Sequence, residues 1–478
     1  MPLAFAPFYL WPLAILVPAV LLWLLRDEWS LKQVFIIGYC FGLGYLGFGV
    51  YWIYNSLHDF GQAAPPVAGG LTALLIVYLA LYPAASLMSW AYARRAFGAS
   101  ALWCLPLLWF GFEWLKGWII TGMPWLSIGY SQTGSPLAGF APLIGVYGIG
   151  ALCLLMSVAL YLLFSQRRYS MLGLVLAIPL TGWLLLHIQW TEPGESLRVT
   201  MVQGNIPQEV KWRGDQQQNI FNTYWRETNA HWDSELIVWP ETALPGDSAS
   251  IEQSLLQPMQ QVAVEQATPI MAGLVVSEDN YSRYYNSVIL LGTERAYYHK
   301  RHLVMFGEYY PMRWLLDLFR DWILIPYSDL TPGPAGQPSI RVRGNTFGIS
   351  ICFEDVFSRD VFLDLPQANL LVNVSNDAWF GDSTAPHQHL QIAQMRSLEA
   401  ERVMLRSTNT GVSAFIDHKG RIYGRSEQFK TESITADALG RNGVTPFYYF
   451  LKVQGLLAVI SILVILFLAR RRPLKSLS

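Results

Sequence analysis

The polar half of the chain contains a cysteine, a lysine and a glutamate, the side chains that nucleophilic catalysis at a carbonyl group requires. Cys352 ends the apolar run FGISIC, Glu241 ends ELIVWPE, and Lys300 lies in YYHKRHLV. The thiolate is the nucleophilic form of cysteine, and a lysine charge stabilises both a thiolate and the oxyanion of a tetrahedral intermediate. A glutamate takes the thiol proton as general base. We therefore interpret these three residues as a candidate catalytic triad.

Two carboxylates, Glu354 and Asp355, follow Cys352 closely and would make the thiol less reactive by raising its pKa. A nearby cation has to offset them, and we expect Lys300 to do so. Cys352 is the single cysteine of the polar half, which excludes a disulfide within that half. The other cysteines lie in long apolar runs: Cys40, Cys104 and Cys153.

Each of these residue types also has an ordinary structural interpretation. A lone cysteine often fills a hydrophobic core, a glutamate suits the first turn of a helix, and a lysine suits a solvated surface. Histidines offer a rival chemistry, because His299, His387 or His389 would form a Cys-His dyad with Cys352. The pair His387-x-His389 would bind a metal only with a third ligand, which the sequence does not define. We therefore expect neither a metal site nor a cofactor.

The composition places much of the chain in a membrane. Of the 478 residues, 53% are hydrophobic and only 14% are charged, which is too apolar for an ordinary soluble protein. A span needs about 20 residues, and apolar stretches of that order lie near residues 8–25, 34–57, 67–91, 100–118, 143–164, 170–188 and 449–469. We expect a transmembrane helical domain of about six spans over 1–189, a catalytic domain over 190–448, and a C-terminal span with a basic tail over 449–478.

Lysines and arginines in the short loops predict the orientation of these spans. Basic residues follow the first, third, fifth and last spans, whereas the loops 58–66 and 119–142 contain none. The basic positions are Arg26, Lys32, Arg94, Arg95, Arg167, Arg168, Arg470, Arg471, Arg472 and Lys475. These loops are predicted to face the cytoplasm, so residues 190–448 face outward. No basic block with interleaved aromatic residues suggests a nucleic-acid partner.

Within residues 190–448, apolar runs typical of strands alternate with helical patterns. The runs are 197–203, 235–241, 269–276, 286–292, 347–354, 369–375 and 411–417. A helix is predicted over 386–403, where Pro386 suits the first turn. Alternating strands and helices predict a layered α/β sandwich.

The motifs around the candidate triad resemble the nitrilase superfamily. They are VWPE, the lysine of HKRHLVMFGEYYP, the cysteine of ICFED and the following NVSNDAWF. Motifs elsewhere are similar to a membrane-bound branch, the apolipoprotein N-acyltransferase family: LAFAPFYLWP, YWIYNSLHDFG, TGMPWLSIGYSQ, MVQGNIPQEVKW, FGEYYP and MLRSTNTGVSAF. The resemblance covers nearly the whole chain. It implies a membrane α-helical bundle joined to a nitrilase-like α-β-β-α sandwich with a Glu-Lys-Cys triad.

The resemblance assigns roles position by position. Glu241 matches the general base of the family, Lys300 its oxyanion lysine and Cys352 its nucleophile. Glu308 and Glu354 match two further glutamates of its active site. A hydrogen bond from Lys300 to Glu308 would keep the lysine cationic beside the thiol.

Other positions concern the substrate. Trp212 matches a tryptophan that is implicated in substrate handling. We interpret the stretch 312–330, which includes Trp314 and Phe319, as an amphipathic arm on the membrane surface, with a buried internal helix as the alternative. The chain departs from the family in two ways: Phe353 replaces a tyrosine after the cysteine, and the stretch AFAPFYLWP, which normally follows one more membrane helix, begins at residue 4.

The resemblance implies an acyl transfer from a membrane phospholipid, through a thioester on Cys352, to the α-amine of the N-terminal diacylglyceryl-cysteine of a lipoprotein. It places a multi-pass enzyme in the bacterial inner membrane with its catalytic domain in the periplasm, and we expect a monomer. Two alternatives stay open: a membrane-bound amidase or nitrilase, and a transporter or receptor with an inactive nitrilase-like sensor domain. The scarcity of ionisable residues in the spans, where Glu113 and Lys116 are the main exception, argues against transport.

Overall fold

The computed structural model describes residues 1–26, 29–278, 281–309 and 330–471. The chain divides into two compact units, which interleave along the sequence. The first comprises Met1–Tyr51, Gly69–Trp190 and Thr445–Ser478, and the second comprises Trp52–Ala68 and Thr191–Val444.

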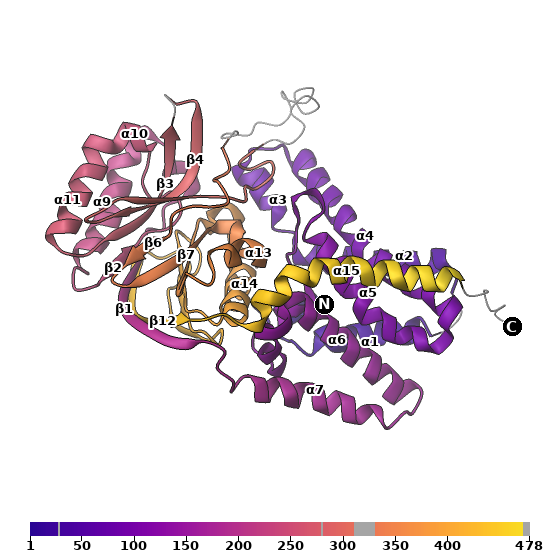
Figure 1. Cartoon of the computed structure of the whole chain (residues 1–478). Helices are drawn as coiled ribbons and strands as arrows, with labels where there is room; N and C mark the ends of the chain where they lie inside the picture. The colour runs from indigo at the N-terminus through magenta and orange to yellow at the C-terminus, as the bar shows by residue number, and fades with distance from the viewer. Residues whose placement is uncertain (27–28, 279–280, 310–329, 472–478) are drawn as a thin grey trace. The chain divides into compact units, whose positions relative to one another are not determined.

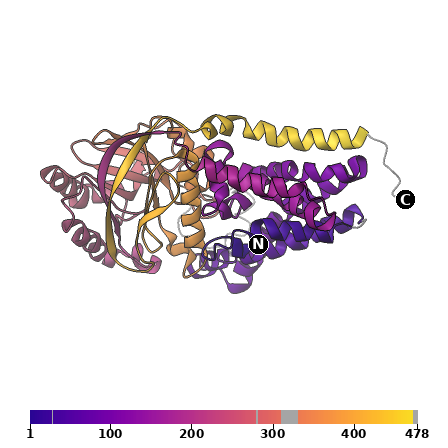
Figure 2. The same cartoon turned by 90° about the horizontal axis from the view of Figure 1, so that it is seen from below.

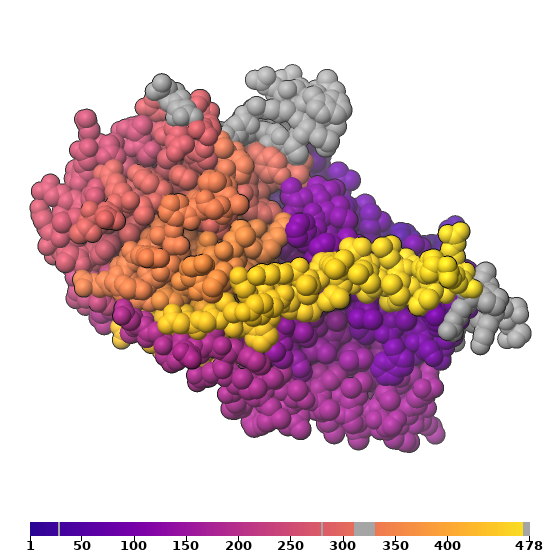
Figure 3. Space-filling model, viewed as in Figure 1, coloured from indigo at the N-terminus to yellow at the C-terminus, as the bar shows by residue number. Residues whose placement is uncertain are grey.

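The first unit consists of apolar helices (Figure 1). They are α1 (Leu13–Leu24), α2 (Leu31–Gly49), α4 (Pro65–Phe97), α5 (Leu105–Lys116), α6 (Ala141–Ser165), α7 (Met171–Leu185) and α15 (Pro446–Arg471). Among the described residues, four helical stretches are long and apolar enough to cross a membrane: Leu31–Gly49, Pro65–Lys116, Pro136–Ser165 and Pro446–Arg471. Figure 3 shows α15 in yellow as a continuous surface band, on which apolar side chains such as Leu463 and Phe467 are exposed. A membrane helical region is therefore confirmed, while the count of seven crossings stays a prediction.

Local sequence signals explain several helix boundaries in this unit. Ser30 begins α2 with a capping box, in which its side chain accepts a hydrogen bond from Gln33 N and the Gln33 side chain accepts one from Ser30 N. Gly145 breaks α6 with a φ of +62°, and a Cβ there would collide with the Phe447 ring. The span expected over 34–57 is too long, because α2 ends at Gly49 and Trp52 already belongs to the second unit.

The second unit contains two six-stranded sheets. The first has the order β12-β1-β2-β3-β4-β5, and the second has the order β11-β10-β9-β8-β7-β6. The strands are β1 (Glu192–Gln203), β2 (Leu236–Val238), β3 (Ile270–Glu278), β4 (Arg283–Leu291), β5 (Ala296–His299), β6 (Ile340–Val342), β7 (Asn345–Ile351), β8 (Leu370–Ser375), β9 (Met404–Thr408), β10 (Ala414–Ile416), β11 (Ile422–Arg425) and β12 (Glu432–Asn442). Both sheets have three neighbouring parallel strands, β1-β2-β3 and β7-β8-β9, with antiparallel strands outside them.

The two sheets pack face to face, with helices on their outer faces. Apolar side chains of both sheets form one buried core, for example Met201 and Val238 with Ile351 and Val374. A second core joins the first sheet to α9 (Gln217–Asn229), α10 (Ser248–Ile251) and α11 (Gln257–Glu265). The helices α13 (Ser358–Val361) and α14 (Ala385–Ala400) pack on the second sheet. This arrangement confirms the predicted α-β-β-α sandwich.

The parallel strands determine where functional side chains gather. Parallel neighbours end at the same edge of a sheet, and loops at that edge commonly contain binding residues. Glu241 follows β2, and Cys352 follows β7 directly. Figure 2 shows β1 and β12 side by side, and their antiparallel pairing from Glu192 to Gln203 connects the beginning and end of this unit.

Candidate active site

Cys352 begins a 3-10 turn, Cys352–Val356, directly after β7. Its φ is +52°, in the left-handed region that non-glycine residues seldom adopt. The Cys352 carbonyl oxygen lies 3.2 Å from Asn373 Nδ2 and 3.3 Å from His389 Nε2. Surrounding contacts therefore hold a sharp turn that leaves the thiol only partly buried, as a nucleophile requires.

The Glu241 carboxylate is fixed by donors on both oxygens. Oε1 accepts a hydrogen bond of 2.7 Å from Asn286 Nδ2, and Oε2 accepts one of 2.8 Å from the backbone N–H of Asn376. The ammonium of Lys300 lies 3.8 Å from Oε1. Because the carboxylate is 7% exposed and oriented by these contacts, it is placed to exchange protons without reorganisation.

Lys300 is a buried ammonium with a carboxylate partner. It is 1% exposed, and Nζ donates a hydrogen bond of 2.9 Å to Glu308 Oε1. The other oxygen, Glu308 Oε2, accepts a hydrogen bond of 2.7 Å from Val304 N. Burial opposes the charge of Lys300, but Glu308, Glu241 and Cys352 raise its pKa above the ordinary value. The hydrogen bond expected between Lys300 and Glu308 is thus present, and the lysine stays cationic.

The resting thiol is protonated. Burial raises the pKa of Cys352 well above its usual range, and the Glu241 carboxylate raises it further, whereas Lys300 lowers it. Lys300 acts in the expected direction, but burial and Glu241 together have the larger effect on the thiol pKa in the resting state. Because the thiol keeps its proton, the reaction requires a base. Of the two carboxylates that raise the pKa of Cys352, Glu241 and Asp377, Glu241 has the larger effect.

Glu354, one of the two acidic residues after Cys352, accepts hydrogen bonds from backbone N–H groups and from the Tyr298 hydroxyl. Its Oε1 accepts hydrogen bonds of 2.6 Å from Arg301 N and 3.0 Å from His302 N, and Oε2 accepts one of 2.7 Å from Ile351 N. Burial raises the pKa of Glu354 to about 7, although these donors oppose the rise. Glu354 thus joins the end of β7 to the segment that directly follows Lys300.

Asp355, the second acidic residue, belongs to a buried ion cluster of Asp355, Asp377, His389 and Arg406. His389 Nε2 lies 2.9 Å from Asp355 Oδ1, and Nδ1 lies 3.0 Å from Asp377 Oδ1. Arg406 lies 3.0 Å from Asp377 Oδ2 and 3.4 Å from Asp355 Oδ2. The two carboxylates raise the pKa of His389 against the effect of burial, so we assign it as an imidazolium. All four side chains are at most 1% exposed, and each cation contacts both anions.

Two of the three histidines considered as rivals make other polar contacts in this structure. His389 bridges the two aspartates, and His299 Nδ1 lies 2.7 Å from Ser287 Oγ. The described part of the chain contains no group of three or more His, Cys, Asp or Glu side chains arranged to hold a metal ion. His387 is half-buried on the first turn of α14, and burial lowers its pKa.

Sequence reasoning missed three polar residues around Glu241. Asn286, on β4, donates hydrogen bonds to both Glu241 Oε1 and Glu308 Oε1, the second over 2.9 Å. Asn376 contributes its backbone N–H, as described above. Lys211 ends the short helix α8 (Gln208–Lys211), and its Nζ donates a hydrogen bond of 3.0 Å to the Glu241 carbonyl oxygen. Lys211 and Asn376 lie within the quoted motifs MVQGNIPQEVKW and NVSNDAWF, but the motifs do not show that both residues contact Glu241.

The remaining expected residues are less closely connected to the triad. Trp212 follows Lys211 and is half-buried. Trp314 and Phe319 lie outside the described residues, as does nearly all of the expected arm 312–330. Phe353, in place of the usual tyrosine, packs edge-on against Phe357 with ring centroids 5.2 Å apart.

The segment Trp52–Ala68 supports the turn that follows Asn376. Ser56 Oγ donates a hydrogen bond of 2.7 Å to the Trp379 carbonyl oxygen, and Asn55 Nδ2 donates one of 3.3 Å to the Phe380 carbonyl oxygen. These carbonyls end the 3-10 turn Asp377–Phe380, where backbone acceptors lack helical partners. Trp52 adds an edge-on contact with the Phe380 ring at 4.7 Å. A part of the chain that lies in sequence between α2 and α4 therefore supports a loop of the candidate active site.

Family profiles match both parts of the chain. The profile of the apolipoprotein N-acyltransferase N-terminal domain matches residues 1–159, and that of carbon-nitrogen hydrolase matches residues 198–443. Apolipoprotein N-acyltransferase of Methylococcus capsulatus is 41% identical over 94% of this chain and 90% of that protein. The chain belongs to the apolipoprotein N-acyltransferase family. The enzymes of the same name from Nitrosomonas europaea and Coxiella burnetii are 42% and 37% identical, over 93% and 98% of this chain and 90% and 98% of theirs.

Solved structures of the carbon-nitrogen hydrolase class are also similar. Nit3 of Saccharomyces cerevisiae, a nitrilase superfamily member, aligns with a TM-score of 0.39 and 16% identity over 55% of this chain and 95% of Nit3. The carbon-nitrogen hydrolase match over residues 198–443 covers nearly all of the two-sheet unit, so the predicted nitrilase-like fold is confirmed.

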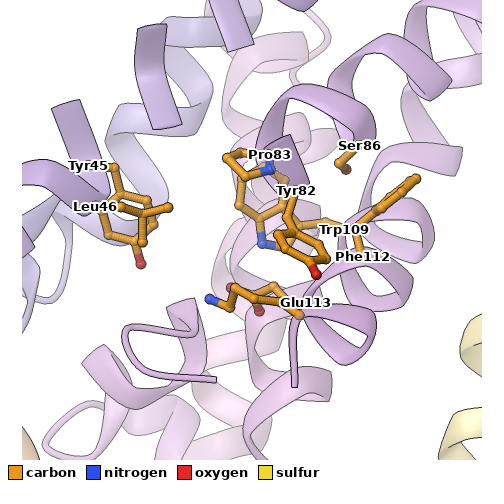
Figure 4. A pocket seen from close by; sticks show the side chains of 9 residues that line it. Tyr45, Leu46, Tyr82, Pro83, Ser86, Trp109, Phe112 and Glu113 are labelled. Atoms are coloured by element: carbon orange, nitrogen blue, oxygen red, sulfur yellow. The ribbon is translucent and has the colours of Figure 1, made fainter. Parts of the chain in front are cut away.

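The part matched by the family's N-terminal domain contains its own buried ionisable pair, Glu113 and Lys116, near the end of α5. Both line a small pocket together with Tyr82 and Ser86 (Figure 4). Glu113 Oε1 accepts a hydrogen bond of 2.9 Å from Ile128 N, and Lys116 Nζ donates one of 3.3 Å to the Trp125 carbonyl oxygen. These contacts connect α5 to the loop that carries the motif TGMPWLSIGYSQ.

Proposed function

We propose that this enzyme transfers a fatty acyl chain from a membrane phospholipid to the α-amine of the N-terminal diacylglyceryl-cysteine of lipoproteins, through a thioester on Cys352. Membership of the apolipoprotein N-acyltransferase family supports the overall reaction. The observation that carries the mechanism is the position of Glu241 and Lys300: a fixed carboxylate and a permanent ammonium 3.8 Å apart, both acting electrostatically on a protonated thiol.

In the first half-reaction, Glu241 takes the Cys352 proton as sulfur attacks the ester carbonyl of the phospholipid. Negative charge moves to the former carbonyl oxygen, and the Lys300 ammonium stabilises it. When the intermediate collapses, the carbon–oxygen bond to the glycerol backbone breaks, and Glu241 returns its proton to the leaving alkoxide. The products are a lysophospholipid and a thioester on Cys352.

In the second half-reaction, the neutral α-amine of the acceptor attacks the thioester carbonyl. Glu241 takes a proton from the nitrogen, the carbon–sulfur bond breaks, and the thiolate regains the proton as Cys352 returns to its resting form. Conversion of a thioester to an amide is downhill, which explains why the phospholipid reacts first. Water has to be excluded from the thioester, because hydrolysis would waste the acyl chain.

The product distinguishes this function from a membrane-bound amidase. The purified enzyme is incubated with phospholipid vesicles and a short peptide with an N-terminal diacylglyceryl-cysteine. We expect the peptide to gain one acyl group in an amide bond, with one lysophospholipid formed per acyl group. Free fatty acid as the main product, with an unmodified peptide, would support the hydrolase instead.

We also propose that the catalytic unit lies on the periplasmic side of the bacterial inner membrane. The alternation of basic loops supports this orientation. In a variant without the four native cysteines, a cysteine at Ala249, which is exposed on α10, should react with a membrane-impermeant thiol reagent in intact spheroplasts. A cysteine at Ser165, beside Arg167 and Arg168, should react only after permeabilisation, and the reverse pattern would contradict the orientation.

A further inference from the structure

Lys211 is a second buried lysine at the candidate active site. It is 2% exposed, and its ammonium donates a hydrogen bond of 3.0 Å to the backbone carbonyl of Glu241. Within the described residues it forms no ion pair with a carboxylate, in contrast to Lys300, which contacts Glu308 at 2.9 Å. The ionisable groups that act on it are Glu241, at the end of β2, and Cys352, at the end of β7.

A buried ammonium without a carboxylate in contact is costly, because it loses hydration that an ion pair would replace. Among the buried cations of this unit, Lys300 and Arg406 contact carboxylates, whereas Arg402 donates hydrogen bonds to backbone carbonyl oxygens. The cost at Lys211 is offset if negative charge develops nearby during the reaction. A preorganised cation of this kind stabilises the charged intermediate more than the resting state, which is the condition for faster reaction.

We propose that Lys211 is a second active-site cation, which positions Glu241 through its carbonyl and stabilises the negative charge that arises at Cys352 during thioester formation. This inference rests on the proposed function. The resting site contains two carboxylates, Glu241 and Glu308, and two ammonium groups, with a neutral thiol. Proton transfer from the thiol to Glu241 keeps the total charge constant but moves a negative charge to sulfur, where both lysines stabilise it.

The pH dependence of the first half-reaction follows from this role. Burial lowers the pKa of Lys211 to about 8, although Glu241 and Cys352 oppose the shift. Lys211 is therefore cationic below about pH 8 and becomes neutral as the pH rises through that value. The pKa values of Lys300 and Cys352 are both raised above their ordinary values, so neither group loses its proton in this range.

The test is the single-turnover rate of acyl-enzyme formation, measured between about pH 6 and 10 with phospholipid vesicles and no acceptor. In the wild type we expect the rate to fall above about pH 8. Lys211→Met should be about tenfold slower at pH 7 and should lack this fall, a smaller loss than the ~10²–10³ found for direct oxyanion donors. Lys211→Arg, which keeps its charge at high pH, should hold its rate to higher pH than the wild type. Glu209→Gln, an exposed change on the same short helix, is the matched control and should retain the wild-type profile.

A fall near pH 8 that persists in Lys211→Met would overturn the inference, because another group would then be responsible. If Lys211→Met does not fold, Lys211→Arg decides: an unshifted profile overturns the role of Lys211. A wild-type rate that stays constant up to pH 9.5 would do the same. These outcomes differ from failure of the proposed function itself, in which the wild type forms no acyl-enzyme at any pH.

Discussion

Two groups of buried charges lie next to Cys352, and they differ in how completely they are paired. In the buried ion cluster of Asp355, Asp377, His389 and Arg406, each cation contacts both carboxylates. Around the thiol, Lys300 is paired with Glu308, whereas Lys211 donates a hydrogen bond to a carbonyl oxygen and forms no ion pair with another described residue. Every charge of the first group contacts an opposite charge at rest, whereas we propose that Lys211 in the second group gains such a partner when negative charge forms on sulfur.

We infer from this difference that the first group is structural and that the second group is catalytic. A fully paired buried network stabilises a defined geometry, here the turn at Cys352, whose carbonyl lies 3.3 Å from His389. An incompletely paired cation can stabilise negative charge that develops during the reaction. Changes in the first group should therefore reduce stability, and changes in the second should reduce the rate of thioester formation.

The largest effect on rate is expected for Lys300→Met. Loss of the ammonium removes the stabilisation of the oxyanion and should slow acyl-enzyme formation about 10²–10³-fold. The variant also leaves Glu308 without its cation, so the rate is measured per folded enzyme. Lys419→Met, which removes a half-buried lysine paired with Glu401, is the matched control. An unchanged rate in Lys300→Met would contradict the role of this lysine.

A loss of stability with a small change in rate is expected for His389→Gln. The change leaves two buried aspartates with one cation between them and should cost about 3 kcal/mol. Because the folded-state pKa of His389 is raised, its contribution is full below the unfolded value of about 6.5 and disappears as the pH rises through the folded-state pKa. Thermal unfolding in detergent between pH 6 and 9 checks this.

The wild type should become less stable towards higher pH, and His389→Gln should lose that part of the dependence. Asp377 has the opposite effect on stability. Despite burial, Arg406 and His389 lower its pKa to about 2, so its contribution to stability is lost as the pH falls towards that value. His231→Gln, a half-buried histidine outside the cluster, is the control. Equal pH dependence in the wild type and His389→Gln would show that the imidazolium does not stabilise the fold.

The smallest effect is expected for Ser56→Ala, which removes the hydrogen bond to the Trp379 carbonyl. One neutral hydrogen bond contributes about 1 kcal/mol, so loosening of the turn that holds Asn376 against Glu241 should slow acyl-enzyme formation only about threefold. Ser56→Thr keeps the hydroxyl and should restore the rate. Asp59→Ala, exposed in the same segment, controls for a general disturbance. A tenfold loss in Asp59→Ala would argue against a specific role of Ser56.

The fold could be predicted from sequence where hydrophobic pattern was strong. The run 369–375 became β8, and the helix expected over 386–403 begins one residue earlier, with Pro386 in its first turn. Strands such as β12 were missed because ESITADALGRN is largely polar and partly exposed, so its pairing with β1 has no apolar signal. The run 235–241 gave a strand of only three residues, Leu236–Val238, since the chain turns at Pro240.

The sequence predicted which residues at the strand ends form the candidate site, but it did not predict the hydrogen bonds that connect them. Asn286 reaches two carboxylates because β4 pairs with β5 in a register that places it next to Lys300, whose N–H donates 2.8 Å to the Asn286 carbonyl. Sequence does not specify that register. Likewise, the sequence matched Glu354 to an active-site glutamate but did not show that its carboxylate would bind the backbone N–H groups of Arg301, His302 and Ile351.

The central claim is that Cys352 receives the acyl group directly from phospholipid. The most direct measurement is intact-protein and peptide mass spectrometry after incubation of the purified enzyme with phospholipid vesicles alone. We expect a mass gain of one acyl chain on the peptide that contains Cys352, sensitive to neutral hydroxylamine, with release of lysophospholipid and no adduct in Cys352→Ser. An acyl adduct that persists in Cys352→Ser, or its absence from the wild type while peptide acylation proceeds, would contradict the account.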